Sequence, residues 1–326
     1  MSKEGIKTAS DCIFCHKCRD NCSFLGKYGI HIGDIDRLRE LAYHCFLCGR
    51  CTSVCPIGID GRQEIIDIRR SIASSDEGAK VVKRYKGLLS EKRDYRFRNY
   101  RNSNGKVAFF PGCNLPSLYP KTTARLVSIL SERGIGTIYD CCGKPIGELG
   151  FKDDEERIIA DLRKRLSEHG VEELVVACPN CRDFLGDRLG IKIVGIYEKL
   201  HELGIGDAID DDILLYVPCP DRALRVWVDE IRLFARGRIE LADDVQCCGL
   251  GGSAMAEEPE IAESFASALG ELTRDKKLVC YCASCTGRIK RSGYPEVSHI
   301  LTWILGTHES PDTSKSYINR VLTRFK

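Results

Sequence analysis

Cysteine is the residue whose number and spacing in this sequence most clearly indicate chemistry. The 326-residue chain contains 19 cysteines, and eight of them form two runs near the N-terminus with the spacing C-x2-C-x2-C-x3-C. Thiolates at this spacing can wrap around a metal centre, because one short loop presents three sulfurs to it. The two runs are Cys12, Cys15, Cys18 and Cys22, and Cys45, Cys48, Cys51 and Cys55.

The arrangement of the two runs is typical of ferredoxins with two four-iron clusters, in which the fourth cysteine of each run binds the other cluster. It predicts two [4Fe-4S] cubane clusters, one held by Cys12, Cys15, Cys18 and Cys55 and the other by Cys45, Cys48, Cys51 and Cys22. A pair of structural zinc sites is the alternative, although zinc sites seldom use three cysteines in series. Pro56 follows the second run, whereas Ser23 follows the first run in place of the usual proline.

Ten further cysteines form a pattern that occurs twice, at an offset of about 105 residues. Each copy has one cysteine after an apolar run, an adjacent pair followed by glycine, and a later C-x2-C. Because adjacent side chains of an extended strand point apart, the glycine is expected to turn the chain so that both thiols reach one site. The copies are Cys113, Cys141, Cys142, Cys178 and Cys181, and Cys219, Cys247, Cys248, Cys282 and Cys285.

Short apolar runs alternate with amphipathic helical segments from Val107 onward, which predicts α/β units with the cysteines at strand ends. We expect an α/β fold in which a two-cluster ferredoxin-like helical segment precedes a duplicated α/β cysteine-rich domain. Residues 80–106 are strongly basic, and we interpret them as a solvated linker helix rather than a docking surface. The predicted parts are a ferredoxin segment at 1–61, a basic helical linker at 62–106, cysteine-rich modules at 107–206 and 207–310, and a C-terminal tail at 311–326.

Composition gives no reason to expect nucleic acid as a partner, since 49 lysines and arginines nearly balance 47 aspartates and glutamates. The sequence shows no secretory leader and no long apolar segment, so we expect a cytoplasmic protein with no transmembrane segment of its own. Thiols in a reducing compartment are seldom structural disulfides, which favours metal ligation.

The ferredoxin runs and the repeated five-cysteine pattern together resemble the cysteine-rich CCG-domain proteins, typified by the catalytic subunit of heterodisulfide reductase in a fused form. Related iron-sulfur subunits of glycolate oxidase, lactate utilisation and anaerobic glycerol-3-phosphate dehydrogenase share the layout. The resemblance implies that each five-cysteine set is catalytic and holds a non-cubane four-iron cluster, with a small disulfide split between the two clusters. The sequence departs from many relatives at Pro220, where they have histidine, and at Cys280, which we interpret as a buried bystander.

The resemblance implies an oxidoreductase that acts on sulfur groups, most simply a disulfide reductase within a complex. The GLGGS segment at 249–253 follows a cysteine pair and is not a nucleotide fingerprint, so we expect a separate electron-donor subunit of flavoprotein, hydrogenase or cytochrome type. Association with a membrane complex would then depend on that partner. The alternatives are an electron-relay subunit of a flavin dehydrogenase or of a membrane quinone or cytochrome complex, and a regulatory metal-binding protein.

Other polar residues carry weaker signals. Lys144, Asp221 and Tyr281 lie beside cysteines and are candidate proton donors only by position. His201 and His299 are expected to pack within helices. The remaining histidines that we expect at the surface are His16, His31, His44, His169 and His308.

Overall fold

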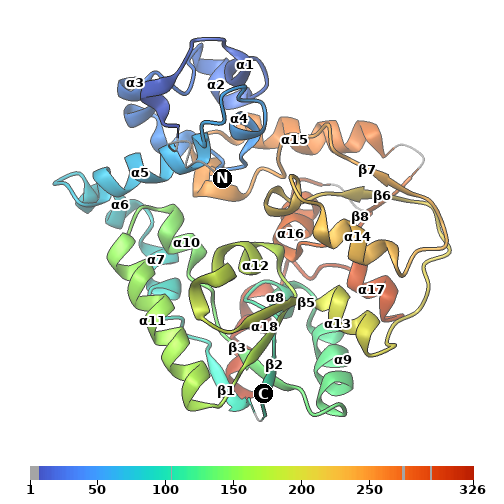
Figure 1. Cartoon of the computed structure of the whole chain (residues 1–326). Helices are drawn as coiled ribbons and strands as arrows, with labels where there is room; N and C mark the ends of the chain where they lie inside the picture. Colours follow the sequence, from blue (N-terminus) through green and yellow to red (C-terminus); the bar gives the residue numbers. More distant parts are fainter. Residues whose placement is uncertain (1–6, 104, 274–275, 294–295) are drawn as a thin grey trace, which may run out of the picture.

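Each cysteine-rich module is built on its own β-sheet (Figure 1), and the four parallel strands of each sheet have the same order, to which the first sheet adds the antiparallel strand β1. The computed structural model describes residues 7–103, 105–273, 276–293 and 296–326. The first sheet has the order β1-β3-β2-β4-β5 and the second β7-β6-β8-β9, so the duplication predicted from the cysteines is present in the fold. The strands are β1 (Asn99–Asn102), β2 (Val107–Phe110), β3 (Gly136–Tyr139), β4 (Glu173–Val176), β5 (Lys192–Gly195), β6 (Ile213–Tyr216), β7 (Ile239–Leu241), β8 (Lys277–Cys280) and β9 (Val297–His299).

The central strands are short apolar runs that are almost wholly buried, as is typical of parallel sheets with helices on both faces. β2 pairs with β4 from Val107 to Phe110, and β6 pairs with β8 from Ile213 to Tyr216, both in parallel. Because parallel strands end at the same edge of their sheet, the loops after these strands lie together. The ten cysteines of the repeated pattern lie after the first three parallel strands of each module along the chain, β2, β3 and β4 in the first and β6, β7 and β8 in the second, in the loops or at the start of the helices that follow.

Helices cover the sheets because each presents an apolar stripe to them. One hydrophobic core extends through both modules and includes Leu126, Leu162 and Val175 of the first and Trp227 and Ile300 of the second. The helices of the first module are α8 (Leu115–Leu118), α9 (Pro120–Ser131), α10 (Lys144–Glu148), α11 (Lys152–Glu168), α12 (Pro179–Leu185), η3 (Gly186–Leu189) and α13 (Ile196–Glu202). Those of the second are η4 (Cys219–Asp221), α14 (Val226–Arg232), η5 (Gly251–Ala256), α15 (Pro259–Leu272), α16 (Ala283–Arg291) and α17 (Ile300–Ile304).

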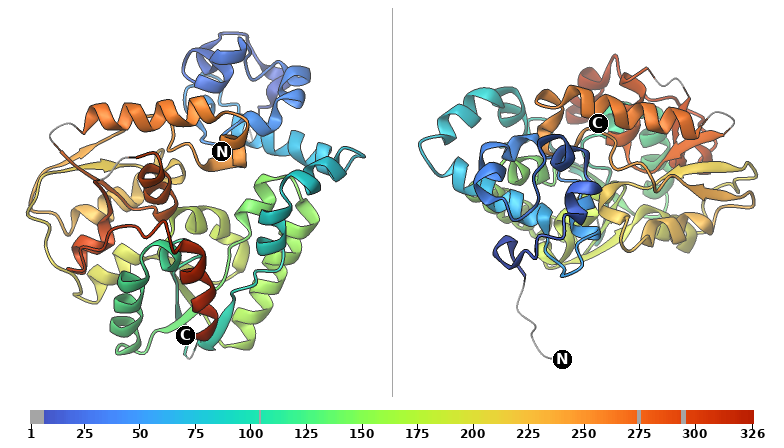
Figure 2. Two further views of the ribbon diagram at one scale, coloured as in Figure 1. Left: turned by 180° about the vertical axis from the view of Figure 1, so that it is seen from behind. Right: turned by 90° about the horizontal axis from the view of Figure 1, so that it is seen from above.

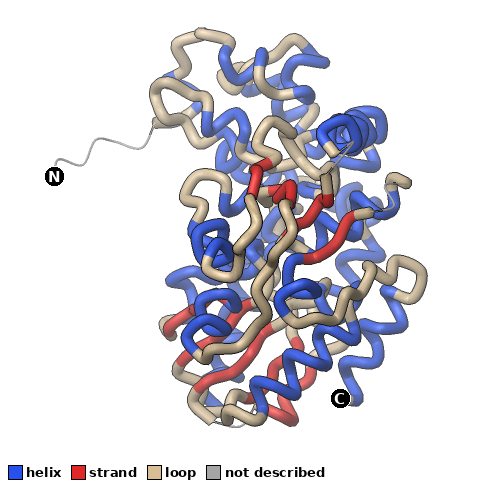
Figure 3. The backbone as a smooth tube through the Cα atoms, turned by 90° about the vertical axis from the view of Figure 1, so that its right-hand side faces the viewer, coloured by secondary structure: helices blue, strands red, loops and turns tan. Residues whose placement is uncertain are grey.

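The N-terminal segment consists of short helices and loops at one end of the molecule (Figure 3). Its core shares side chains with the second module, and the rings of Phe46 and Phe265 meet edge to face with centroids 5.4 Å apart. The segment therefore docks on the second module. Its elements are η1 (Ala9–Asp11), α1 (Lys17–Asp20), α2 (Ser23–Tyr28), α3 (Ile35–Glu40), η2 (Ala42–His44) and α4 (Arg50–Ser53).

The predicted linker differs from a solvated helix in two ways. Its helices α5 (Gly61–Ala73), α6 (Gly78–Arg84) and α7 (Lys86–Lys92) bury Val81, Tyr85 and Leu89 in one apolar cluster with Ile146 and Leu149 of the first module. After them the chain forms β1, which pairs antiparallel with β3 and so belongs to the first sheet. The prediction of a wholly helical, solvated linker was wrong, because packing against the first module overrides the polar composition.

The predicted C-terminal tail contains helix α18 (Ser316–Leu322) and the turn η6 (Thr323–Phe325), which return to the first module (Figure 2). The Asn99 amide of β1 donates to the Thr323 carbonyl at 3.0 Å, and the Arg320 guanidinium meets the Glu91 carboxylate at 2.8 Å. These two contacts therefore attach the C-terminal residues to β1 and α7 at the first module. Among the described helices, none has both the length and the apolar character needed to cross a bilayer.

Candidate metal centre

Four cysteines from both ferredoxin runs line one cavity near the surface of the N-terminal segment, together with Ile32 and Ile59. Cys15 is exposed, whereas burial raises the pKa of the Cys18 thiol. A β-carbon on Gly33 would lie 2.8 Å from that of Cys12, so only glycine fits there. We call Cys12, Cys15, Cys18 and Cys55 the outer set.

The other four ferredoxin cysteines gather deeper in the molecule, and we call Cys22, Cys45, Cys48 and Cys51 the inner set. Each of Cys22, Cys45 and Cys51 lies near enough to another member to be affected by its charge. Burial raises the pKa of Cys22 to about 11 and that of Cys45 to about 12, while a hydrogen bond from Cys247 lowers that of Cys48 to about 6. The grouping is the one that the spacing predicts, and its role in ligation stays a prediction.

The loops of the two runs have the same unusual backbone conformation. Phe14 and Leu47, each between the first two cysteines of a run, have φ values of 56° and 51°. His16 and Gly49, each after the second cysteine, have φ values of 59° and 75° and precede helices α1 and α4. Left-handed non-glycine residues carry strain that a fold retains mainly at functional sites. Both runs therefore use the same left-handed turns around their second cysteine.

The five cysteines of the first module, the first CCG set, form a row of interacting thiols. Cys113 interacts with Cys141, Cys142 interacts with both Cys141 and Cys181, and Cys181 interacts with Cys178, all as free thiols. Gly143, with φ 88°, turns the chain after the adjacent pair, as expected from the sequence. A hydrogen bond from Cys141 and another from Cys181 lower the pKa of Cys142 to about 5. The set comprises Cys113, Cys141, Cys142, Cys178 and Cys181.

The second CCG set repeats this row of free thiols, in which Cys247 interacts with Cys219 and Cys248, and Cys285 interacts with Cys248 and Cys282. Gly249 has φ 82° and turns the chain after the pair. The set comprises Cys219, Cys247, Cys248, Cys282 and Cys285.

Cys280 is fully buried beside the second set. Its sulfur accepts the Cys282 amide at 3.4 Å and it also interacts with Cys285. Its burial agrees with the packing role predicted for it.

Direct contacts join the sets to one another. Cys48 of the inner set interacts with Cys247 of the second CCG set, and Cys178 of the first CCG set interacts with Cys282 of the second. Cys51 of the inner set lies near enough to Cys18 of the outer set to be affected by its charge. A continuous series of thiols therefore leads from the surface near Cys15 through the inner set to both modules.

Gln246 and Asn180 connect the sets, and sequence reasoning missed both. The Gln246 amide donates to Cys22 Sγ at 3.4 Å and to Cys48 Sγ at 3.5 Å, and its oxygen accepts the Ser23 amide at 2.8 Å and the Ser23 hydroxyl at 3.0 Å. The Asn180 amide donates to Cys282 Sγ at 3.5 Å. A proline in place of Ser23 has no N–H for this bond, which explains the departure from the ferredoxin run.

The candidate proton donors occupy different settings. The buried Lys144 ammonium donates to the Asn180 side chain at 2.6 Å, and the Tyr281 hydroxyl donates to the Asp221 carboxylate at 2.8 Å. Burial raises the pKa of Asp221. All three lie close to cysteines of the two CCG sets, but no contact assigns them a proton-transfer role.

Two histidines differ from expectation. His201 lies in α13 as expected but is exposed, with its ring 6.2 Å from that of Phe234. His31 is buried rather than at the surface, and its ring accepts the Gly33 amide at 3.1 Å. His299 packs edge to face on Tyr119, and burial lowers its pKa to about 4, in agreement with the predicted packing role. His44 bonds to the buried Glu258 carboxylate at 2.6 Å and so helps dock the N-terminal segment.

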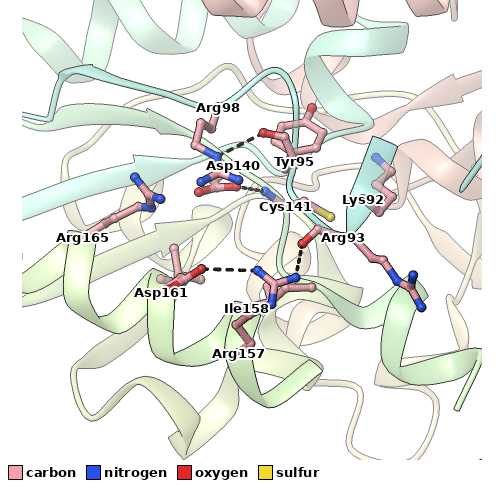
Figure 4. A pocket seen from close by; sticks show the side chains of 11 residues that line it. Lys92, Arg93, Tyr95, Arg98, Asp140, Cys141, Arg157, Ile158, Asp161 and Arg165 are labelled. Carbon is pink, nitrogen blue, oxygen red and sulfur yellow. Dashed lines mark hydrogen bonds and ion pairs between the residues drawn. The ribbon is translucent and has the colours of Figure 1, made fainter. Parts of the chain in front are cut away.

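Cationic side chains from α7 and α11 surround a small pocket beside the first CCG set (Figure 4). Burial opposes the charged form of Lys92, but nearby Cys113, Cys141 and Glu91, whose carboxylate lies 2.8 Å from the ammonium, together raise the Lys92 pKa. Most other cations of the pocket have acidic partners, such as Arg93 with Asp154 at 2.8 Å. The pocket therefore supplies positive charge to the first CCG set from one side.

A larger cleft of about 350 Å³ opens where the inner set meets the second module. Half-buried Cys48 and Cys219 line it, together with Arg50, Arg62 and Arg222. Its volume is within the range of small-molecule sites. It is the place where a solvent-borne molecule can reach sulfurs of two different sets.

Residues 107–186 and 214–290 match the model of the cysteine-rich CCG domain. The chain carries two CCG domains. Its sequence is 24% identical to an uncharacterized iron-sulfur protein of Methanococcus maripaludis and to a subunit of the fumarate reductase (CoM/CoB) of Methanothermobacter marburgensis, each over 89% of this chain and 69% of the relative. It is 22% identical to a subunit of the dihydromethanophenazine:CoB–CoM heterodisulfide reductase of Methanosarcina acetivorans, over 72% of this chain and 68% of the relative.

A solved structure of a hypothetical protein from Helicobacter pylori resembles the fold, with a TM-score of 0.56 over 90% of this chain and 68% of that chain. The two share 11% sequence identity, so the likeness concerns the fold alone. The matches to the CCG model and to these relatives agree with the family resemblance inferred from the cysteine pattern.

The donor chemistry of the four sets fits iron-sulfur clusters. Thiolates are the ligands of such clusters, and buried thiolates need a positive centre to offset their charge. Backbone amides donate to several of the sulfurs, for example Leu47 to Cys45 at 3.3 Å and Gly249 to Cys247 at 3.3 Å. In the described ranges no three His, Cys, Asp or Glu side chains could hold a metal ion as placed. A four-iron cluster differs from a single ion because it distributes its thiolates over several irons, so the sulfurs need not converge on one point.

Proposed function

We propose that this chain is an iron-sulfur oxidoreductase subunit that passes electrons from a partner protein through the outer and inner sets to the two CCG sets, where a small disulfide is reduced. The observation that carries the proposal is the continuous series of thiols from exposed Cys15 to the contact between Cys178 and Cys282. The names of the relatives support it, since they include an iron-sulfur protein and two reductase subunits.

The proposed cofactors are two [4Fe-4S] cubane clusters in the outer and inner sets and two non-cubane four-iron clusters in the CCG sets. When bound, such clusters supply one-electron carriers and, at the CCG sets, iron that can accept sulfur. Reduction of a disulfide to two thiols takes two electrons and two protons. Two five-thiol sets in direct contact are suited to a substrate with two sulfur atoms.

The chain's own side chains would position these parts. Gln246 would hold the inner set against the second module. Asn180, which is itself held by Lys144, would keep the two CCG sets close together. The cleft at Cys48 and Cys219 is the route by which a substrate would enter. A separate electron donor is proposed because the sequence has no flavin or nucleotide fingerprint.

Iron analysis of anaerobically purified protein tests the cofactor proposal. Four four-iron clusters correspond to about 16 irons per chain. Stoichiometric zinc, or about 8 irons with both CCG sets empty, would contradict it. A Cys280→Ser variant is the matched control, since we expect it to retain the full iron content if Cys280 only packs.

Replacement of Cys142 or Cys248 by serine tests the disulfide reaction. Serine is a harder ligand than cysteine, so we expect disulfide turnover and any disulfide-dependent EPR signal to be lost, while donor-driven reduction of the ferredoxin clusters persists. The Cys280→Ser protein should retain turnover.

The relay alternative makes the opposite prediction for the unmodified protein. If it reduces a flavoprotein or cytochrome quickly but shows neither turnover nor an EPR response with any heterodisulfide tested, the disulfide proposal must be abandoned in favour of electron relay.

A further inference from the structure

Arg69 of α5 has an unusual position, because its guanidinium is completely buried where three parts of the chain meet. It donates to the Ala42 carbonyl at 2.8 and 3.0 Å, to Cys45 O at 2.9 Å, to Glu148 O at 2.7 Å and to Gly252 O at 3.0 Å. It also lies 4.8 Å from the centroid of the Tyr43 ring. Every one of these acceptors is a neutral carbonyl.

A buried cation normally has an anionic partner, because carbonyl dipoles replace only part of the hydration that it loses. Among the described residues, no carboxylate forms an ion pair with Arg69, whereas neighbouring Arg70 pairs with Asp67 at 3.0 Å and Glu155 at 3.2 Å. Burial lowers the pKa of Arg69, and the charge that most strongly opposes this effect is that of Cys45. Cys45 of the inner set is followed in this effect by the Glu148 carboxylate, and the Cys45 carbonyl also accepts a hydrogen bond from Arg69 at 2.9 Å, so the guanidinium lies against the inner set.

The outer set has no comparable cation. Its cavity is lined by apolar side chains, His16 and the four thiols, and none of the described residues lining it is a lysine or arginine. The outer set also lies near solvent, with Cys15 exposed. The two ferredoxin sets thus have the same ligands and similar loops, but the inner set has the completely buried Arg69 beside it, in addition to Arg222, whose charge acts on Cys48.

We propose that Arg69 is a positioning residue that raises the reduction potential of the inner ferredoxin cluster above that of the outer one, and so directs electrons inward to the CCG sets. The inference rests on the proposed function, since it requires clusters in both ferredoxin sets. Reduction adds one negative charge to a cluster, and a fixed positive charge in a medium of low dielectric constant stabilises that charge. Arg69 bonds to the Cys45 carbonyl, so this charge is held beside the inner set.

EPR-monitored potentiometry of anaerobic Arg69→Gln, Arg69→Lys and Arg70→Gln proteins tests the proposal, with a Cys12→Ser variant to identify the outer signal. Arg69→Gln removes the charge but keeps a donor, and should lower the equilibrium constant for reduction of the inner cluster at least tenfold, or about 59 mV for one electron. Arg69→Lys and the matched control Arg70→Gln should leave this equilibrium constant within threefold, and none of the three arginine variants should shift the potential of the outer cluster.

An unchanged inner potential in Arg69→Gln with full iron content would overturn the proposal and leave Arg69 a structural tie. An equal shift of both clusters would also overturn it. If Arg69→Gln does not fold, the unmodified protein still decides, because an inner cluster reduced at a lower potential than the outer one contradicts the proposal. Absence of clusters from the ferredoxin sets would instead refute the proposed function itself, and iron content distinguishes the two failures.

Discussion

Gln246 should contribute more to stability than any other neutral side chain at the junction of the N-terminal segment and the second module. Its amide makes two bonds to Ser23 and two to the sulfurs of Cys22 and Cys48. In Gln246→Leu the side-chain volume is nearly kept, but all four bonds are lost and the Ser23 amide is left without this acceptor.

The expected loss follows from these contacts. At about 1 kcal/mol for each bond to Ser23, and about 0.5 kcal/mol for each long bond to sulfur, the sum is about 3 kcal/mol. With an unfolding entropy of about 2.1 cal/mol/K per residue over 326 residues, this corresponds to a decrease in Tm of about 4 °C.

Anoxic thermal unfolding followed by circular dichroism measures this shift. The matched control is Gln63→Leu, the same chemical change on the exposed side of α5, where the amide bonds only to Asp67 at 3.0 Å. We expect the control to change Tm by less than 1 °C, since exposed substitutions are usually near neutral. The reasoning is refuted if the two variants unfold at the same temperature.

Other substitutions test neighbouring parts of the argument. Ser23→Pro suits the first position of a helix, but we expect it to destabilise the protein by about 1–2 kcal/mol and to be non-additive with Gln246→Leu in a double-mutant cycle. Gly61→Ala places a β-carbon 2.6 Å from Cys51 Sγ and should reduce iron content, whereas Gly87→Ala, with open space around it, should retain all iron. Cys22→Ser should alter the EPR signal of the inner cluster and spare the outer one.

The repeated fold was predictable because its signals are local. Apolar runs such as 107–110 and 213–216 precede cysteines in both copies, and the structure has β2 and β6 at these places. The grouping of the eight ferredoxin cysteines was likewise predictable, because the fourth-cysteine crossover is a property of the spacing. The glycine turns at Gly143 and Gly249 follow from the geometry of adjacent side chains.

The parts that sequence reasoning missed depend on contacts between distant residues. Gln246 and Cys22 are 224 positions apart, and Arg69 and Gly252 are 183 positions apart, so no window of sequence contains either pair. β1 was missed because its sequence, NYRN, is polar and its partner strand β3 is needed to explain it. A basic composition predicts exposure only where no apolar surface from elsewhere covers the chain.

The two CCG domains have the same fold but contact different parts of the chain. The residue before each cysteine pair shows this difference. In the second domain Gln246 faces the inner set, whereas in the first domain the matching Asp140 accepts the Tyr100 hydroxyl of β1 at 2.7 Å and its carboxylate also accepts the Cys141 amide. One copy therefore uses this position to meet the N-terminal segment, and the other uses it to hold the strand that closes its sheet.

The contacts between thiols place the two CCG sets one after the other, with the second set between the inner set and the first set. The second set touches the inner set through Cys247, while the first set touches the rest of the series only through Cys178, among the contacts of the described residues. On the proposed function, electrons must therefore reach the first set by way of the second. We expect that Asn180→Leu, which removes the amide bond to Cys282 at this contact, slows reduction of the first set after rapid mixing with reductant. Equal reduction rates for the two sets in the unmodified protein would show that they are filled in parallel.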